Sequence, residues 1–182
     1  MKNFKLSVLA SALFFTAFSN AAEQPQAKDI VGKGYGGFHL SFIKPDEDRL
    51  NGINDDFEIS DGIGFEAGYR LDENSEFRFS YTDLTIEFEN ANNDSGEAIS
   101  LDLLYFPTKQ NAYVLGGMNK LQIGESDLSA NFGVGYRHYF SENFAAYAEA
   151  KGHYHFDESY IDQTAQIGLI FFFGDSAKPA TK

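Results

Sequence analysis

At residues 62–71 the chain reads Gly-Ile-Gly-Phe-Glu-Ala-Gly-Tyr-Arg-Leu, so apolar residues alternate with small or charged ones. Successive side chains of a β-strand point to opposite faces, and the stretch therefore predicts a strand with one apolar face. The other face carries Glu66 and Arg70. In a soluble sandwich such a charged face meets water, whereas in a membrane barrel it points into the lumen.

Seven further stretches alternate in the same way between turn residues. The eight expected strands are residues 34–44, 62–71, 76–88, 98–106, 112–123, 128–140, 144–156 and 162–173. They predict an all-β fold, an eight-stranded antiparallel up-and-down transmembrane β-barrel over residues 32–174. Closure leaves no unpaired backbone edge, which is why a barrel is the form of sheet that spans a bilayer.

Two of these stretches change their pattern along their length. In residues 76–88 the apolar parity shifts to Leu84, Ile86 and Phe88, which predicts a β-bulge near Thr82–Asp83. For residues 112–123 the expected outward residues are Tyr113, Leu115, Leu121 and Ile123, and the expected lumen residues are Lys120 and Gln122.

The N-terminus predicts export. Lys2 and Lys5 precede a largely apolar stretch, Leu6 to Phe18, and small residues follow, so residues 1–21 are expected to be a signal peptide. Cleavage is expected after Ala21, with Ala22 as the second choice. Residues 22–31 are then a polar periplasmic leader, and residues 175–182 a periplasmic tail.

The net charge and the lengths of the connections between strands predict where the barrel lies and which way it faces. The chain has a formal net charge of −13, which disfavours nucleic acid and is compatible with divalent cations at lipopolysaccharide. It has no cysteine, which excludes disulfides and thiolate chemistry. Short turns at residues 72–75, 107–111 and 141–143 alternate with a long connection at residues 44–61. Because barrels keep short turns in the periplasm, both termini are expected there, with the barrel in the outer membrane.

Three motifs resemble a known family. They are Gly-Phe-Glu-Ala-Gly-Tyr at 64–69, Tyr-Val-Leu-Gly-Gly-Met at 113–118 and Gln-Ile-Gly-Leu-Ile-Phe-Phe-Phe-Gly at 166–174. In order and spacing they resemble the transmembrane domain of the outer membrane protein A family. Larger members continue through a Pro/Ala-rich linker into a peptidoglycan-binding domain. Residues 177–180 resemble the start of that linker, but the sequence ends two residues later, so we do not expect anchoring to peptidoglycan.

The resemblance also implies a role for Glu66. It matches a glutamate whose salt bridges close or gate a narrow pore in that family. The residues that pair with this glutamate in the family are replaced near Leu103, Arg137 and Tyr147, so the resemblance implies a different set of salt bridges in this chain. From the residues themselves, the expected lumen charge network comprises Glu66, Arg70, Asp102, Lys120, Arg137, Glu149 and Lys151. We expect Glu66 to be ionised and paired with Lys120, Arg137 or Lys151, because an unpaired carboxylate in a narrow lumen is costly.

Other chemistry-bearing residues favour no enzyme. His39 and Ser41 share the expected lumen face, whereas lipid chemistry would need them to face lipid. His153 and His155 lack a third placed metal ligand, and the spacing of the acidic residues in 46–61 fits no EF-hand. We therefore expect no catalytic residue, no metal and no cofactor.

Two functions stay open on the sequence. One is a structural or surface-interaction protein with a lumen plugged by paired charges; the other is a narrow pore, gated or not, for ions or small solutes. The expected partners are outer-membrane lipid, lipopolysaccharide with divalent cations, and the barrel assembly machinery, with the protein itself a monomer. Leu169, Phe171 and Phe173 before Gly174 form the expected assembly signal.

Overall fold

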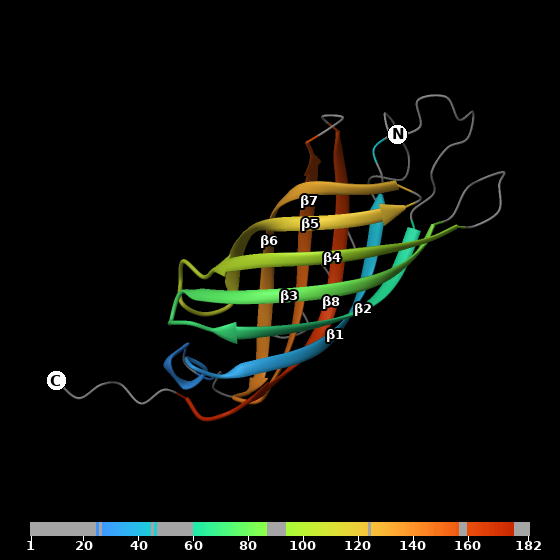
Figure 1. The fold of residues 1–182 in the computed structure, drawn as a ribbon. Helices are drawn as coiled ribbons and strands as arrows, with labels where there is room; N and C mark the ends of the chain where they lie inside the picture. The colour runs from blue at the N-terminus through green and yellow to red at the C-terminus, as the bar shows by residue number, and fades with distance from the viewer. Residues whose placement is uncertain are drawn as a thin grey trace, which may run out of the picture.

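The computed structural model describes residues 25, 27–44, 46, 60–86, 94–123, 125–156 and 160–176. Within these ranges, eight antiparallel strands close into one barrel in which each strand pairs with its neighbours in sequence and β8 pairs with β1 (Figure 1). The strands are β1 (Gly34–Lys44), β2 (Ser60–Arg70), β3 (Ser75–Ile86), β4 (Asp94–Tyr105), β5 (Ala112–Ile123), β6 (Glu125–Ser141), β7 (Phe144–His155) and β8 (Ile161–Phe173). The predicted up-and-down barrel is thus confirmed. No described helix is long and apolar enough to cross a bilayer.

The strands are staggered around the barrel. The stagger can be followed from Lys44 on β1 to its partner on β8, and then from partner to partner around the barrel. This path returns to β1 at Gly34, ten residues from where it began. This stagger tilts the strands against the barrel axis. Eight tilted strands leave an interior that side chains can fill.

The barrel has two distinct ends. The turn end holds the tight connections at residues 71–74, 106–111 and 142–143, together with the short 3₁₀ helix η1 (Ala27–Asp29) and the end of β8. It lies at the left in Figure 1. The opposite end, where β1 and β2, β3 and β4, β5 and β6, and β7 and β8 are joined, is called the loop end below.

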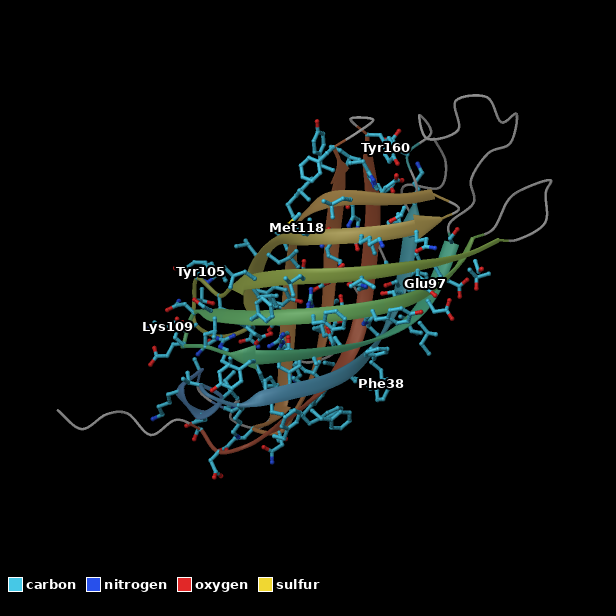
Figure 2. All side chains as sticks on the ribbon, in the orientation of Figure 1. Phe38, Glu97, Tyr105, Lys109, Met118 and Tyr160 are labelled. Carbon is cyan, nitrogen blue, oxygen red and sulfur yellow. The ribbon has the colours of Figure 1, made fainter. Side chains whose placement is uncertain are left out.

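Burial alternates along most of each strand, except at residues 137–139 of β6, next to a register shift, and at residues 151–153 of β7. Large apolar side chains stand outward and are exposed, among them Phe38, Tyr105 and Met118, which project from the wall in Figure 2. The inward positions are mainly polar, charged or aromatic and are buried. The molecule is therefore apolar outside and polar inside, the reverse of a soluble protein.

The bulge predicted near Thr82–Asp83 is wrong. The β2–β3 and β3–β4 pairs run without interruption, so Leu84 points inward and is 2% exposed. It packs against Ile43 and Leu121 inside the barrel. Burial of this apolar cluster favours the regular register, and Asp83 then lies outward near the loop end, where it is exposed. Phe88 lies outside the described residues.

The face assignment of β5 is also wrong. Tyr113, Leu115 and Leu121 are buried inside, whereas Lys120 and Gln122 are exposed on the outside. The strand has apolar residues on both faces, so alternation alone did not define it. The tertiary structure decides, because Tyr113 inside donates a hydrogen bond to Glu149. The side chain of Ile123 lies outside the described part.

Glycines make room for the large inward side chains. In six cross-strand pairs of the described strands with a polar or charged inward partner, a Cβ added to the glycine would lie 2.2–3.0 Å from an atom of the partner's side chain. The pairs are Tyr35 with Gly68, His39 with Gly64, Asp102 with Gly117, Tyr113 with Gly135, Tyr147 with Gly168 and Lys151 with Gly133. Each of these side chains thus lies over a glycine on the neighbouring strand, which has no side chain of its own.

Candidate functional site

The centre of the lumen is occupied by one arginine and three carboxylates. Arg78 of β3 is 1% exposed, and its two terminal nitrogens donate to Glu149 Oε2 at 2.9 Å and Glu149 Oε1 at 3.0 Å. Its Nη2 also donates to Asp102 Oδ2 at 3.1 Å, and its Nη1 lies 3.5 Å from Glu66 Oε2. Because these acids stand on β7, β4 and β2, the contacts tie together strands from opposite parts of the wall. We call these four residues the central layer.

Neighbouring side chains add further contacts to the three acids, although Glu66 Oε1 has no hydrogen-bond partner among the described residues. Tyr113 donates to Glu149 Oε2 at 2.8 Å, and Tyr147 donates to Glu66 Oε2 at 3.1 Å. Asn131 donates to Asp102 Oδ1 at 2.9 Å, and Lys151 Nζ lies 3.4 Å from Glu149 Oε1. A buried ion pair is retained only with such additional hydrogen bonds, because its charges have lost their water.

A second charged layer lies toward the turn end. Glu76 accepts a bidentate pair from Arg137, with 2.6 Å to Nη1 and 2.7 Å to Nη2, and a further hydrogen bond from Tyr35 at 2.6 Å. Arg70 Nη1 lies 3.5 Å from Glu76 Oε2, and its guanidinium sits 3.8 Å above the ring centre of Phe106. Planar guanidinium groups suit such stacked, bidentate sites. These three charged residues form the turn layer.

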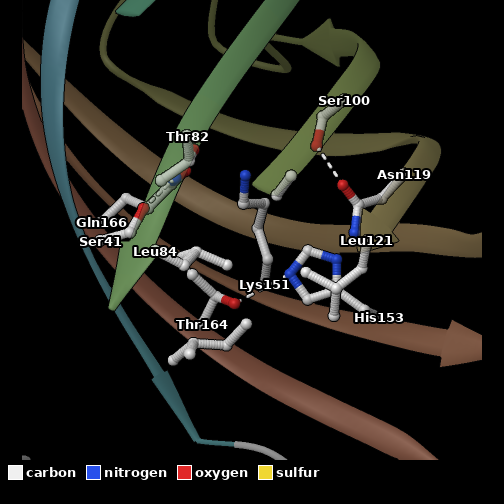
Figure 3. A pocket seen from close by; sticks show the side chains of 12 residues that line it. Ser41, Thr82, Leu84, Ser100, Asn119, Leu121, Lys151, His153, Thr164 and Gln166 are labelled. Atoms are coloured by element: carbon white, nitrogen blue, oxygen red, sulfur yellow. Dashed lines mark hydrogen bonds between the residues drawn. The ribbon is translucent and has the colours of Figure 1, made fainter. Parts of the chain in front are cut away.

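The loop half of the lumen is mainly polar, and its buried charged residues include Lys151 and Asp162. A small cavity there, of about 20 Å³, is lined on several strands by Ser41, Thr82, Asn119, Lys151 and His153 (Figure 3). That volume holds about one water molecule. The apolar cluster of Ile43, Leu84 and Leu121 also borders the cavity.

Most of the residues proposed for the lumen network lie inside, in one of the two layers. Lys120 does not: its side chain is on the outer surface, because the β5 register is the reverse of the expected one. The expected pairing of Glu66 with Lys120, Arg137 or Lys151 is therefore corrected to Arg78.

Sequence reasoning missed the two residues that organise the layers, Arg78 and Glu76. Alternation in residues 76–82 did place Arg78 opposite the apolar face. Glu76, at the start of the strand, lies on the same face. Both could have been included by following that face to the end of the strand.

The inward histidines are engaged separately. His39 Nε2 lies 2.8 Å from Thr82 Oγ1, and Ser41 accepts a hydrogen bond from Gln166, so the two do not form a nucleophile pair. His153 bonds Asn131 and Thr164, while His155 Nε2 lies 3.0 Å from Asp162 Oδ2. Among the described residues, no group of three or more His, Cys, Asp or Glu is arranged to hold a metal.

At the turn end, outside the strands, Asp72 has a shifted pKa. Asp72, between β2 and β3, accepts hydrogen bonds from the backbone N–H groups of Asn74 at 2.7 Å and Ser75 at 2.8 Å. The Asn74 bond is the main cause that lowers the pKa of Asp72 below its ordinary value. The same bonds fix the tight turn that brings Glu76 into the barrel.

Comparison with known proteins identifies the family. The model of the outer membrane protein beta-barrel domain matches residues 8–173, nearly the whole chain. The chain belongs to this family. It is thus an outer-membrane β-barrel, as the alternating strands indicated.

Three solved structures are similar to the chain. The N-terminal β-barrel domain of Pseudomonas aeruginosa OprF is 22% identical, with a TM-score of 0.56, over 78% of this chain and 99% of that one. Ail, the attachment invasion locus protein of Yersinia pestis, is 15% identical, with a TM-score of 0.49, over 79% and 99%. OprG from Pseudomonas aeruginosa is 12% identical, with a TM-score of 0.47, over 82% and 99%. At these identities the likeness concerns the fold alone.

Proposed function

We propose that this outer-membrane barrel is a closed protein of structural or surface-interaction type, not an enzyme, whose lumen passes no ions or solutes. The observation that carries the proposal is the central layer. Arg78 reaches acids on three other strands, so the cross-section of the lumen is filled by mutually bonded side chains. The turn layer repeats this arrangement below it.

Energetics favour the closed state. An ion or water passing the central layer has to separate Arg78 from Glu149, which are both buried and share two hydrogen bonds. Separating a buried pair costs about 3–5 kcal/mol, because each charge is left without a partner in a poorly hydrated site. Two such layers in series make spontaneous opening rare.

Conductance across planar lipid bilayers tests this proposal. The purified barrel is expected to give no discrete current steps. A double variant, Arg78→Ser with Glu149→Ser, removes both partners of the main pair and leaves space, so it is expected to conduct. Lys120→Ser is the matched control, because Lys120 stands on the outside. Current steps in the parent protein as frequent as in the double variant would refute a closed lumen.

A narrow pore is the second candidate, and the polar loop half of the lumen supports it. Eight of the twelve residues that line the cavity beside Lys151 and His153 are polar or charged. In that case the central layer is a gate, and the parent protein shows brief current steps that Glu66→Ala lengthens. The same bilayer recordings therefore distinguish the two functions.

For orientation, we propose that the turn end faces the periplasm. Short turns and the barrel's first and last described residues lie there, as in bacterial barrels generally. Single cysteines decide this, because the chain has none of its own. On intact cells, an impermeant maleimide is expected to label Ser126→Cys near the loop end and to spare Lys109→Cys in a turn. Labelling of Lys109→Cys alone would show that the turn end faces the outside of the cell.

For partners, we propose outer-membrane lipid around the apolar wall, lipopolysaccharide bridged by divalent cations, and the barrel assembly machinery. The exposed apolar side chains support the first, and the net charge of −13 supports a role for cations. Leu169, Phe171 and Phe173 stand outward and exposed at the end of β8, as an assembly signal requires. A monomer on size-exclusion chromatography in detergent is the expected form.

A further inference from the structure

Residues ahead of β1 fold back into the barrel. Ile30 is 2% exposed and packs in a cluster of inward side chains from β1, β6, β7 and β8. That cluster consists of Ile30, Tyr35, Tyr139, Ala145, Tyr147, Ile170 and Phe172. The sequence predicts that residues 22–31 are a polar periplasmic leader, and the burial of Ile30 departs from that prediction.

Backbone contacts hold the segment across the mouth. Gly32 N donates to Arg70 O at 2.9 Å, and Arg70 N donates to Lys33 O at 3.1 Å, so the segment is tied to the end of β2. Gly32 has a φ of 84°, which a glycine adopts without strain and which turns the chain back toward η1. Without this turn the chain would continue outward along β1.

Side-chain contacts tie the segment to the other side of the mouth. Lys33 Nζ donates to Glu142 O and to Asn143 Oδ1, both at 3.3 Å, and lies 3.6 Å from Glu142 Oε2. Glu142 and Asn143 form the turn between β6 and β7, whereas Arg70 ends β2. The segment therefore bridges two separated parts of the rim, with Ile30 between them pointing inward.

We propose that residues 27–33 are a built-in stopper of the lumen at the turn end, distinct from the two charged layers. Ile30 serves as its apolar tip, and the Gly32–Arg70 and Lys33–Glu142 contacts are its two attachments. The stopper keeps water from the aromatic cluster that surrounds the turn layer. Its release would expose that cluster without breaking any strand pair.

Cysteine labelling in lipid vesicles tests the stopper, since the chain has no other thiol. Reaction with an impermeant maleimide requires an accessible thiolate. Ile30→Cys is expected to react at least about tenfold more slowly than Lys28→Cys, because Ile30 is buried and Lys28, two positions earlier, is exposed. Both should react equally after unfolding in urea. Equal rates in the folded barrel would overturn the proposal.

A second experiment tests what the stopper covers. Ala145→Cys lies in the same cluster and is fully buried, and the substitution is small. It is expected to be protected in the parent and to become reactive, by about tenfold, when Ile30→Asp drives the tip out. Lys28→Asp is the matched control and should leave Ala145→Cys protected. The folded state of each variant is checked by its heat-modifiable gel mobility. Continued protection of Ala145→Cys beside Ile30→Asp in a folded barrel would show that the segment is not the cover.

Discussion

Arg78→Met is the sharpest test of the central layer. Methionine fills a similar volume but donates no hydrogen bond. The variant removes three hydrogen bonds, two to Glu149 and one to Asp102, and leaves three buried acids near one another without their shared cation. Tyr113, Tyr147 and Lys151 still contact these acids and limit the loss.

The expected loss of stability is about 3–5 kcal/mol, the range found when one partner of a buried ion pair is removed. Each lost bond to a charged group accounts for about 1.5–3 kcal/mol on its own. The sum exceeds the expected total, because bonds in one network are not independent. Lys120→Met provides the control and should stay within about 0.5 kcal/mol of the parent, since Lys120 is exposed.

Reversible folding into lipid vesicles under urea measures this loss. The chain contains no tryptophan, so the folded fraction is followed by gel mobility and by circular dichroism. A double-mutant cycle with Glu149→Gln isolates the pair, whose coupling is expected to be about 0.5–3 kcal/mol. A loss below about 1 kcal/mol for Arg78→Met, with no coupling, would mean that water rather than protein solvates the acids and that the lumen is not dry.

Four further predictions follow from other parts of the molecule. Gly117→Ala should destabilise the barrel by about 1–3 kcal/mol, because its Cβ would lie 2.2 Å from Leu101 O, whereas Gly116→Ala, whose Cβ meets nothing closer than 3.9 Å, should be tolerated in the same urea titration. Ala148→Arg on the outer face should cost about 2–4 kcal/mol in bilayers, and an equal or greater cost for Glu149→Gln would contradict the β7 register. Replacing both Phe171 and Phe173 by Ser should leave protease-sensitive protein in the periplasm, and normal heat-modifiable migration in cells would exclude these residues as an assembly signal. Asp72 has a lowered pKa in the folded barrel, so its contribution to stability is complete at pH values above its ordinary pKa of 3.8 and is lost as the pH falls through the lower pKa of the folded state. Asp72→Asn should therefore make stability fall less steeply with acid pH. An unchanged acid dependence would show that the turn bonds have no effect on stability.

The fold was largely predictable from the sequence because the membrane and the lumen impose opposite chemistry on alternate residues. In β2, β6 and β7 the two faces differ so clearly that period-two alternation defines them. The predictions failed where apolar residues stand on both faces. Leu84 and Leu121 are apolar and yet inward, since they meet Ile43 inside the barrel, and no local pattern encodes that contact.

The pairing inside the lumen was less predictable, because closure brings together residues that are distant in the chain. Arg78 and Glu149 are 71 positions apart, and Arg137 and Glu76 are 61 positions apart. Which side chains meet depends on the ten-residue stagger, which accumulates over all eight strands. An error in one strand, such as the reversed faces of β5, therefore changes which side chains are available as lumen partners: Lys120 lies outside, and Tyr113 lies inside and contacts Glu149. The stopper was missed for a related reason, since Ile30 is a single apolar residue in a polar stretch and only the barrel mouth gives it a place to pack.

In each glycine pair, the partner's side chain fills the space that the glycine leaves in the interior. Each of Gly68, Gly135 and Gly168 accommodates a tyrosine from the neighbouring strand, so the relevant unit of packing is the pair and not the single position. Exchanging the members of a pair would keep the volume while moving the side chain to the adjacent strand. In related barrels, paired lumen residues should accordingly change together, with a large residue gained on one strand when the neighbouring strand loses one. The strands can then keep their arrangement while the lumen side chains change.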